Sequence, residues 1–329
     1  MFAITPVPIF EYLARVVAGI RRSLMPDPVL PNLYHYTSDS GLIGITTTRS
    51  LRATCADCLA DSTEIHHGAE LLAEIVDSRL AKQTQFRKLT RLVLERLRTQ
   101  PQERKSKTYI ACFCESSDLA HLWDRYGSYC LRFSVAGDSG PQLKPRAWNV
   151  SVQFVQAIYG VRDQYSALAS LVEQVCVALE DRSTIQGDID GPWTQSIVQY
   201  LSFWVAELAL DVLVSFKSEQ YADEREWRLV VRPQQIPCWS DKLGPDRDFG
   251  ALVKQEDGRR YVELIRRPLL HPLSPPSARP IPFDSVIVPS GNDTSRFRET
   301  AERILRQNSR SDIPVEFSPT RQMTRPVTQ

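Results

Sequence analysis

The sequence predicts an α+β fold with a mixed or antiparallel sheet as its core and helical insertions around it. Three observations predict this fold. Hydrophobic residues make up 42% of the 329-residue chain, which is enough to build a packed core. Short segments with the two-residue alternation of strands are interspersed with longer segments of helical spacing. The two kinds follow one another irregularly, whereas a parallel α/β protein would show regular strand–helix alternation.

Strands are predicted where apolar and polar residues alternate, or where short apolar runs lie between turns. The sharpest pattern places Glu224, Glu226 and Arg228 on one face of a strand and Trp227 and Leu229 on the other. The predicted strands cover residues 33–37, 51–54, 109–114, 129–135, 150–159, 224–231, 261–265, 286–288 and 315–317.

Helices are predicted where apolar residues recur three or four positions apart. The first, within residues 1–25, is amphipathic and ends at a group of three prolines. The most apolar stretch, residues 197–216, contains Glu207 and Asp211, which is typical of a core helix and not of a membrane span. The other predicted helices cover residues 40–45, 61–100, 118–126, 164–181, 193–216 and 296–307.

The chain is expected to divide into three parts. Residues 1–31 form an N-terminal helical appendage, residues 32–318 a single domain, and residues 319–329 a loose tail. The domain carries a basic helical insert at 79–107, with ten Lys/Arg against two acids. A proline-rich insert covers 233–282, because thirteen of the 22 prolines follow residue 230.

The charge balance excludes a field that draws the whole protein to nucleic acid or to a membrane. Lys and Arg number 40 against 39 Asp and Glu, so such a partner needs a local patch. The basic insert offers one for nucleic acid through Arg87, Lys88 and Arg91. Seven cysteines form an odd set without the density of a secreted scaffold, and we expect a cytoplasmic location.

Two short segments could carry chemistry. In residues 33–38, alternation places His35 and Thr37 opposite Tyr34 and Tyr36. A core histidine between packed tyrosines is the structural alternative. The second segment is the row that contains Glu224, Glu226 and Arg228, for which a weak ion pair on a solvated sheet face is the alternative.

Metal chemistry has weaker signals. Cys55 and Cys58 precede His66 and His67, but the spacing is atypical for zinc, and no metal is expected. A metal-dependent hydrolase would use Asp61, Glu64 and Asp118 as oxygen ligands, although these acids also fit helix caps. Glycine-rich nucleotide signatures and the commonest hydrolase motifs do not occur in the sequence.

Taken in order, a set of short motifs resembles the bacterial family called domain of unknown function 2971. The resemblance covers about residues 32–318, and each motif alone is short. Three features depart from the pattern: Ala60 stands where the family usually has asparagine, Ser290 and Gly291 are shifted relative to the usual Ile-Gly-Pro turn, and a proline-rich segment near 268–282 is extra. The matching segments are residues 33–38, 51–54, 61–64, 112–115, Trp123, 126–127, Lys217, 224–228 and 286–291.

A weaker resemblance links the same residues to ADP-ribosyltransferases. It implies that His35 and Thr37 bind the ribose of NAD as the family's first motif, with Tyr34 beside them among the cofactor-binding residues. The Glu-x-Glu motif of the family corresponds to Glu224 and Glu226. Tyr36 stands where part of that family has glycine.

The resemblance also implies roles for the remaining site residues. Trp123 or Tyr126 would stack on nicotinamide, and Arg228 would keep Glu226 ionised or contact the pyrophosphate. Glu226 would stabilise the positive charge that develops on the ribose when nicotinamide leaves. Glu224 would activate or position the acceptor.

The sequence leaves three functions open. The first is an NAD-dependent ADP-ribosyltransferase or NAD-cleaving effector of the toxin or phage-defence kind, with a protein or nucleic acid as acceptor. The second is an inactive module of the same fold that binds nucleic acid or a partner protein. The third is the metal-dependent hydrolase. The first requires His35 and Glu226 to face one cleft.

Overall fold

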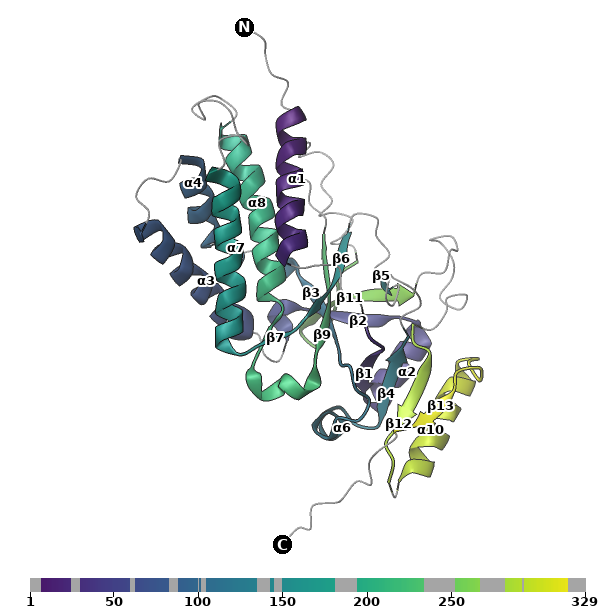
Figure 1. The fold of residues 1–329 in the computed structure, drawn as a ribbon. Coiled ribbons are helices and arrows are strands. Elements are labelled where there is room, and N and C mark those ends of the chain that lie inside the picture. The colour runs from purple at the N-terminus through teal and green to yellow at the C-terminus, as the bar shows by residue number, and fades with distance from the viewer. Residues whose placement is uncertain are drawn as a thin grey trace.

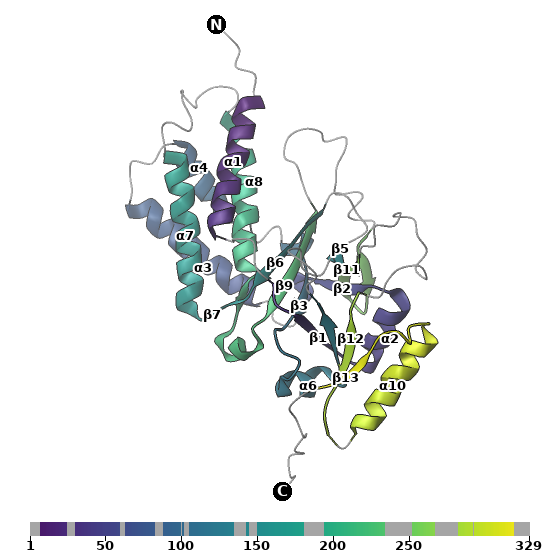
Figure 2. The same cartoon turned by 45° about the vertical axis from the view of Figure 1, so that its right-hand side comes forward.

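The computed structural model has an α+β architecture of three layers (Figure 1). A layer of long helices packs on one face of a larger sheet, and a smaller sheet packs on the other face. The long helices and the smaller sheet lie toward opposite ends of the molecule in both views (Figure 2). The structure describes residues 7–24, 30–59, 63–82, 88–99, 101, 105–134, 143–144, 150–180, 194–233, 252–266, 282–291 and 293–318.

The larger sheet is antiparallel, and we call it the large sheet. Its strand order is β10-β11-β2-β3-β9-β6, and β5 (Leu143–Lys144) also pairs with β11. The antiparallel pairing confirms that part of the predicted core. The strands are β2 (Leu51–Cys55), β3 (Tyr109–Phe113), β6 (Val150–Gln156), β9 (Trp227–Pro233), β10 (Lys254–Glu256) and β11 (Arg259–Arg266).

The smaller sheet is mixed, and we call it the small sheet. Its order is β1-β4-β12-β13, where the last pair is parallel and the others are antiparallel. A backbone bridge between Tyr34 and Cys114 joins it to the end of β3. A short parallel pair, β7 (Ile158–Tyr159) with β8 (Phe216–Lys217), stands apart. The strands are β1 (Leu33–Thr37), β4 (Tyr129–Phe133), β12 (Ser285–Val288) and β13 (Val315–Phe317).

The helical layer covers the face of the large sheet opposite the small sheet (Figures 1 and 2). It consists of α1 (Val7–Leu24), α3 (Thr63–Lys82), α4 (Lys88–Leu97), α7 (Val161–Glu180) and α8 (Thr194–Leu213). The other described helices are α2 (Asp39–Thr48), α6 (Ala120–Tyr126) and α10 (Thr294–Gln307), with 3-10 turns η1 (Ala56–Cys58), η2 (Lys105–Lys107) and η4 (Glu219–Glu224).

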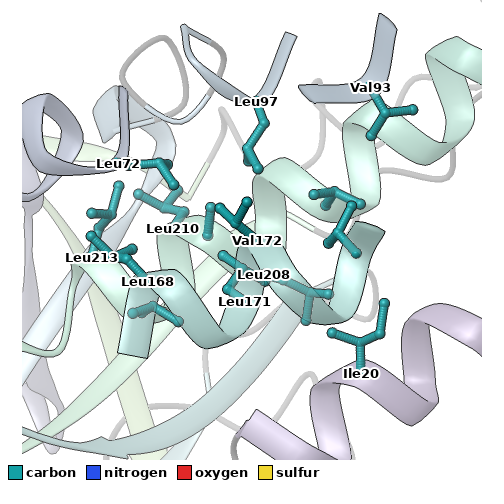
Figure 3. Close-up of a cluster of buried hydrophobic side chains, with 14 of the residues drawn as sticks. Ile20, Leu72, Val93, Leu97, Leu168, Leu171, Val172, Leu208, Leu210 and Leu213 are labelled. Carbon is teal, nitrogen blue, oxygen red and sulfur yellow. The ribbon is translucent and has the colours of Figure 1, made fainter. Parts of the chain in front are cut away.

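Two large hydrophobic cores lie on either side of the large sheet. In β9, Val230 faces the helical layer, while Leu229 and Val231 face the small sheet. The alternation of a strand buried on both faces explains this split. Figure 3 shows the helical core, where Leu171 and Val172 of α7 lie near Leu208 of α8.

The N-terminal helix is present but is not an appendage. Helix α1 packs against α7 and α8, and its Val17 and Ile20 are buried in the helical core (Figure 3). The apolar stripe of α1 predicts that this helix is amphipathic. The stripe does not indicate which surface covers it, so the packing against α7 and α8 could not be predicted.

The basic insert is more than one helix. Helix α3 ends at Lys82, α4 begins at Lys88, and residues 83–87 between them, including Arg87, lie outside the described part. The predicted apolar face is confirmed over α4, where Leu89, Val93 and Leu97 are buried.

The strand predicted at 224–231 begins later than its pattern suggests. Glu224 closes the 3-10 turn η4, Arg225 has a left-handed backbone, and β9 starts at Trp227. The acidic row is therefore made by a turn and a strand together. Its side chains are buried, so the solvated sheet face that was the alternative is wrong.

Within the proline-rich insert, residues 252–266 form the β10–β11 hairpin, which contains the predicted strand. Residues 234–251 and 267–281 of that insert and the predicted tail at 319–329 lie outside the described residues. Helix α8 is long and apolar enough to cross a membrane by composition, but 78% of that stretch is buried within the protein. This burial is typical of a core helix.

Candidate functional site

A large cavity opens beside β1. Its volume is about 940 Å³, and its walls come from β1, α2, β2 and the hairpin of β10 and β11. This size falls within the roughly 300–1,000 Å³ typical of small-molecule sites. We call it the His35 cavity. The lining residues that matter here are His35, Thr37, Arg52, Thr54, Glu256 and Arg259.

The histidine in this cavity has a defined tautomer. Nδ1 of His35 lies 2.9 Å from the carbonyl oxygen of Cys112. Because a carbonyl oxygen only accepts, Nδ1 carries the proton in this bond. Burial lowers the pKa of His35, and the bond to Cys112, which favours the protonated ring, offsets this only in part. The ring is therefore neutral near pH 7, and Nε2 is left as a hydrogen-bond acceptor.

The mouth of the cavity is charged. Arg52 forms an ion pair with Glu256, and its guanidinium stacks 4.3 Å from the ring centre of Tyr261. Glu256 and Arg259 face each other across the hairpin, whose two turn residues have φ of 49° and 75°. Positive φ at both positions defines the tight turn that suits the twist of a hairpin. The hairpin thus brings a carboxylate and a guanidinium to one side of the cavity.

A second group of polar residues lies on the helical side of the large sheet. It consists of Glu64, Lys217, Glu224, Glu226 and Arg228, and we call it the ionic cluster. The last four residues are each no more than 8% exposed. Charges buried to this extent need partners, because isolated burial costs several kcal/mol per ion.

Each charge in the ionic cluster has a partner. Nζ of Lys217 donates to Oε2 of Glu224 and to Oε2 of Glu226. Nε of Arg228 donates to the other oxygen of Glu226, and its Nη2 lies 3.0 Å from Glu64. Both oxygens of Glu226 are therefore occupied by cations.

The remaining contacts of Arg228 hold it inside the protein. Its Nη1 donates to the carbonyl oxygens of Val214 and Phe216, at 2.8 Å and 2.9 Å. These carbonyls follow α8 and begin β8, so Arg228 links the helical layer to the sheet. Each nitrogen of this guanidinium therefore has a protein partner, and the ion pair with Glu226 favours the ionised carboxylate.

The pKa directions agree with the pairing. Burial opposes ionisation of Glu226, but the charges of Arg228 and Lys217 outweigh it and lower the pKa of Glu226. Burial likewise opposes the charge on Lys217, and its two carboxylate partners nevertheless raise the pKa of Lys217. Burial, followed by the charge of Glu226, raises the pKa of Cys112 to about 12, so this thiol stays protonated.

The backbone conformation between Glu224 and Glu226 allows both carboxylates to reach Lys217. Arg225 adopts φ 42° and ψ 54°, a left-handed conformation that is uncommon for a residue other than glycine. The N–H of Glu226 then donates to the hydroxyl of Tyr159, at 2.7 Å. This local bend lets Glu224 and Glu226 both reach Lys217.

One edge of the ionic cluster approaches solvent. Nε2 of His121 lies 3.2 Å from Glu224, and its Nδ1 lies 3.5 Å from Asp223; the His121 side chain is 39% exposed. Tyr126 is 44% exposed on the same helix, α6. The arrangement offers a histidine between two carboxylates at the surface.

The structure does not bring His35 and Glu226 to one cleft. The His35 ring lies 5.9 Å from that of Phe113, whereas Glu226 hydrogen-bonds with the thiol of Cys112. Because successive side chains of a strand point to opposite faces, His35 and Glu226 lie on opposite faces of β3. Among the predicted site residues, His35 and Thr37 line the cavity, and Glu224, Glu226 and Arg228 form the separate cluster.

The predicted aromatic residues also separate. Trp123 is buried and packs edge-on against Tyr36 at 5.0 Å, so its ring belongs to the core. Tyr126 is the accessible one of the two candidates, but it lies beside the ionic cluster and does not line the His35 cavity. Tyr34 lies on the face of β1 opposite His35, where burial raises its pKa.

The acids considered as metal ligands have other partners. Glu64 accepts from the backbone N–H of Ser218 and pairs with Arg228, and Asp118 accepts from Ser318. Asp61 lies outside the described residues. In the part of the chain that the structure describes, no three His, Cys, Asp or Glu side chains gather in a way that could hold a metal.

Sequence reasoning missed several of these residues. The sequence suggests Glu64 as a helix-cap acid or a metal ligand, and its pairing with Arg228, 164 positions away, was missed. His121 and Glu256 carry no local signal that separates them from other surface residues. Lys217 stood out only through the family resemblance.

Comparisons with known protein families, with curated proteins and with solved structures found no match.

Proposed function

We propose that this chain is an NAD-cleaving enzyme of the ADP-ribosyltransferase kind and that the His35 cavity binds NAD. The observation that carries the proposal is that His35 and Thr37, the residues implied for ribose binding, line one cavity of about 940 Å³. The neutral ring of His35 adds an acceptor, Nε2, which suits a ribose hydroxyl as donor. The proposal includes membership of the family called domain of unknown function 2971 and a fold similar to that of ADP-ribosyltransferases.

The carboxylate in this proposal is Glu256 and not Glu226. Both oxygens of Glu226 are held by Lys217 and Arg228, and it lies across β3 from the cavity. Glu256 lines the cavity and is oriented by Arg52. In this proposal the two glutamates have different duties, catalytic for Glu256 and architectural for Glu226.

The reaction breaks the bond between nicotinamide and the ribose, and the bonding electrons leave with nicotinamide. Positive charge develops on the ribose, and a carboxylate such as Glu256 stabilises it electrostatically. Water or an acceptor nucleophile then forms the new bond to the same carbon and loses a proton. Hydrolysis and transfer share every step before that attack.

The test measures nicotinamide release from NAD by the purified protein, with and without cell lysate as a source of acceptors. We expect release by the wild type and a loss of about tenfold or more in Glu256→Gln, since a single electrostatic contact to a transition state is worth this much or more. His35→Phe should weaken NAD binding, measured by calorimetry.

The matched control is Glu263→Gln, on the same hairpin but outside the cavity, which should release nicotinamide normally. Absence of NAD binding by the wild type would contradict the proposal. Release that survives Glu256→Gln but is abolished in a folded Glu224→Gln variant would move the catalytic centre to the ionic cluster.

A binding module for nucleic acid is the second candidate, and one observation favours it. Lys88 and Arg91 are exposed on α4, while the opposite face of this helix is buried. Basic side chains on one helix face give salt-dependent contacts to phosphates. Charge reversal at Lys88 and Arg91 should abolish salt-sensitive binding of an oligonucleotide without changing NAD binding.

A further inference from the structure

A second cavity, of about 710 Å³, lies where the C-terminal end of α1 meets α7, β6 and the start of β9. It does not share a lining residue with the His35 cavity. We call it the Glu115 cavity. The lining residues used below are Glu115, Leu24, Pro31, Phe154, Ile158 and Trp227.

The walls of this cavity are mainly apolar, although Ser23, Gln156, Ser170 and Ser215 also line it. Leu24, Phe154 and Ile158 present hydrocarbon surface, and Glu115 is the one charged side chain among the described lining residues. An apolar cavity with a single carboxylate favours a ligand that brings a positive charge on a hydrocarbon body.

The carboxylate of Glu115 has capacity for a further donor. Its Oε1 accepts from the indole N–H of Trp227 at 2.8 Å, and its side chain is 23% exposed. Its Oε2 lies 3.8 Å from the guanidinium of Arg225, whose side chain is 73% exposed. A contact so long and so exposed to solvent is weak, and a better-placed cation can replace it.

We propose that the Glu115 cavity binds a small organic cation, with an ammonium or guanidinium group on an aliphatic stem. The charged group pairs with Oε2 of Glu115, and the stem packs against Leu24, Phe154 and Ile158. The indole N–H of Trp227 holds Oε1 of the same carboxylate, which leaves Oε2 for the cation. This inference does not rest on NAD as a substrate.

The test titrates n-pentylamine into the protein by calorimetry and follows the indole N–H signal of Trp227 by NMR. The matched probes are 1-pentanol, which has the stem without the charge, and pentanoate, which reverses the charge. We expect binding of the amine, a shift of the Trp227 signal, and at least about tenfold weaker binding of both controls. Agmatine tests the guanidinium form.

Three variants sharpen the result. Glu115→Gln keeps an acceptor for Trp227 and should weaken amine binding about tenfold or more. Arg225→Gln removes the competing cation and should strengthen it by up to about fivefold. Glu219→Gln, an exposed acid elsewhere on η4, should change nothing. Equal binding of 1-pentanol, an unshifted Trp227 signal, or unchanged affinity in Glu115→Gln would overturn the proposal, whether or not the protein cleaves NAD.

Discussion

Glu226 illustrates how much of the chemistry of this protein depends on single side chains. The same residue that the motif suggests as a catalytic carboxylate is enclosed between Lys217 and Arg228. Its ionised form neutralises two buried cations, and this duty alone requires a glutamate at the position. A sequence motif can therefore contain the expected glutamate while the side chain of that glutamate forms buried ion pairs within the fold.

Replacing this carboxylate should destabilise the fold. Glu226→Gln leaves Lys217 and Arg228 buried with less negative charge beside them, and we expect a loss of about 3–5 kcal/mol in the free energy of unfolding. Chemical denaturation followed by circular dichroism measures it. Glu219→Gln, which is exposed on the neighbouring turn, should stay within about 0.5 kcal/mol of the wild type. A small effect in Glu226→Gln would show that the ionic cluster contributes little to stability.

His35 should give stability a dependence on pH. Burial lowers the pKa of His35 in the folded protein, so the unfolded chain takes up this proton first as the pH falls. The stability contributed by the neutral ring is present above about pH 6.5 and is lost as the pH falls towards the folded pKa, with a slope of up to about 1.4 kcal/mol per pH unit.

His35→Gln removes this component. The difference in unfolding free energy between wild type and His35→Gln should therefore shrink as the pH is lowered from 7 to 5. Denaturation curves at a series of pH values measure it, and parallel pH profiles for the two proteins would contradict the lowered pKa.

For single residues, the sequence predicts which face of a strand a side chain occupies but not which distant residues it contacts. The alternation in β1 correctly separates His35 from Tyr34, because strand geometry is local. The pairing of Glu64 with Arg228 joins segments far apart in the chain, and nothing local indicates it. The left-handed conformation of Arg225 was missed because the alternation of residues 224–228 indicates a continuous strand, whereas the structure has a turn at this point.

The elements of the helical layer approach each other closely, and α3 shows how this constrains the sequence. A Cβ at Gly68 would lie 2.7 Å from the ring of Phe216 and 2.8 Å from a methyl group of Leu213. Both neighbours are buried and have no room to move. Glycine is therefore required by packing at this point and not by backbone conformation.

Substitution at this contact should reverse the usual preference for alanine in helices. Gly68→Ala should destabilise the protein by about 1–3 kcal/mol through overpacking, measured by thermal or chemical denaturation. The matched change Gly19→Ala, in α1 with nothing within 4 Å of the new methyl group, should stabilise by about 0.5–1 kcal/mol. Stabilisation by both changes would mean that α3 can shift away from β8.

The positions of helices and strands along the chain were the most predictable feature of the structure. Periodicity indicates α7, α8 and α10 correctly, because long amphipathic patterns are local in the chain. The start of β9 was missed, since a 3-10 turn and the left-handed Arg225 precede it where the alternation indicates a continuous strand. The docking of α1 was missed because an amphipathic helix alone does not show what covers its apolar face.

For the whole molecule, the sequence predicts the α+β class but not the three layers. The two hydrophobic cores share β9, whose Val230 belongs to one and Val231 to the other. Sheet order is a property of long-range pairing, and a β4 strand that pairs with both β1 and β12 cannot be inferred from local pattern. The separation of the His35 cavity from the ionic cluster follows from this arrangement.

The ionic cluster also bears on the order in which the chain can fold. Glu64 comes from α3, and its partner Arg228 lies 164 positions later in β9. The other members of the cluster lie within residues 217–228, so the pair between Glu64 and Arg228 is the one that can form only when α3 meets β9. Interactions formed after the rate-limiting step slow unfolding and leave the folding rate nearly unchanged. We therefore expect the Glu64–Arg228 pair to act mainly on the unfolding rate, as a kinetic barrier that holds the assembled layers together.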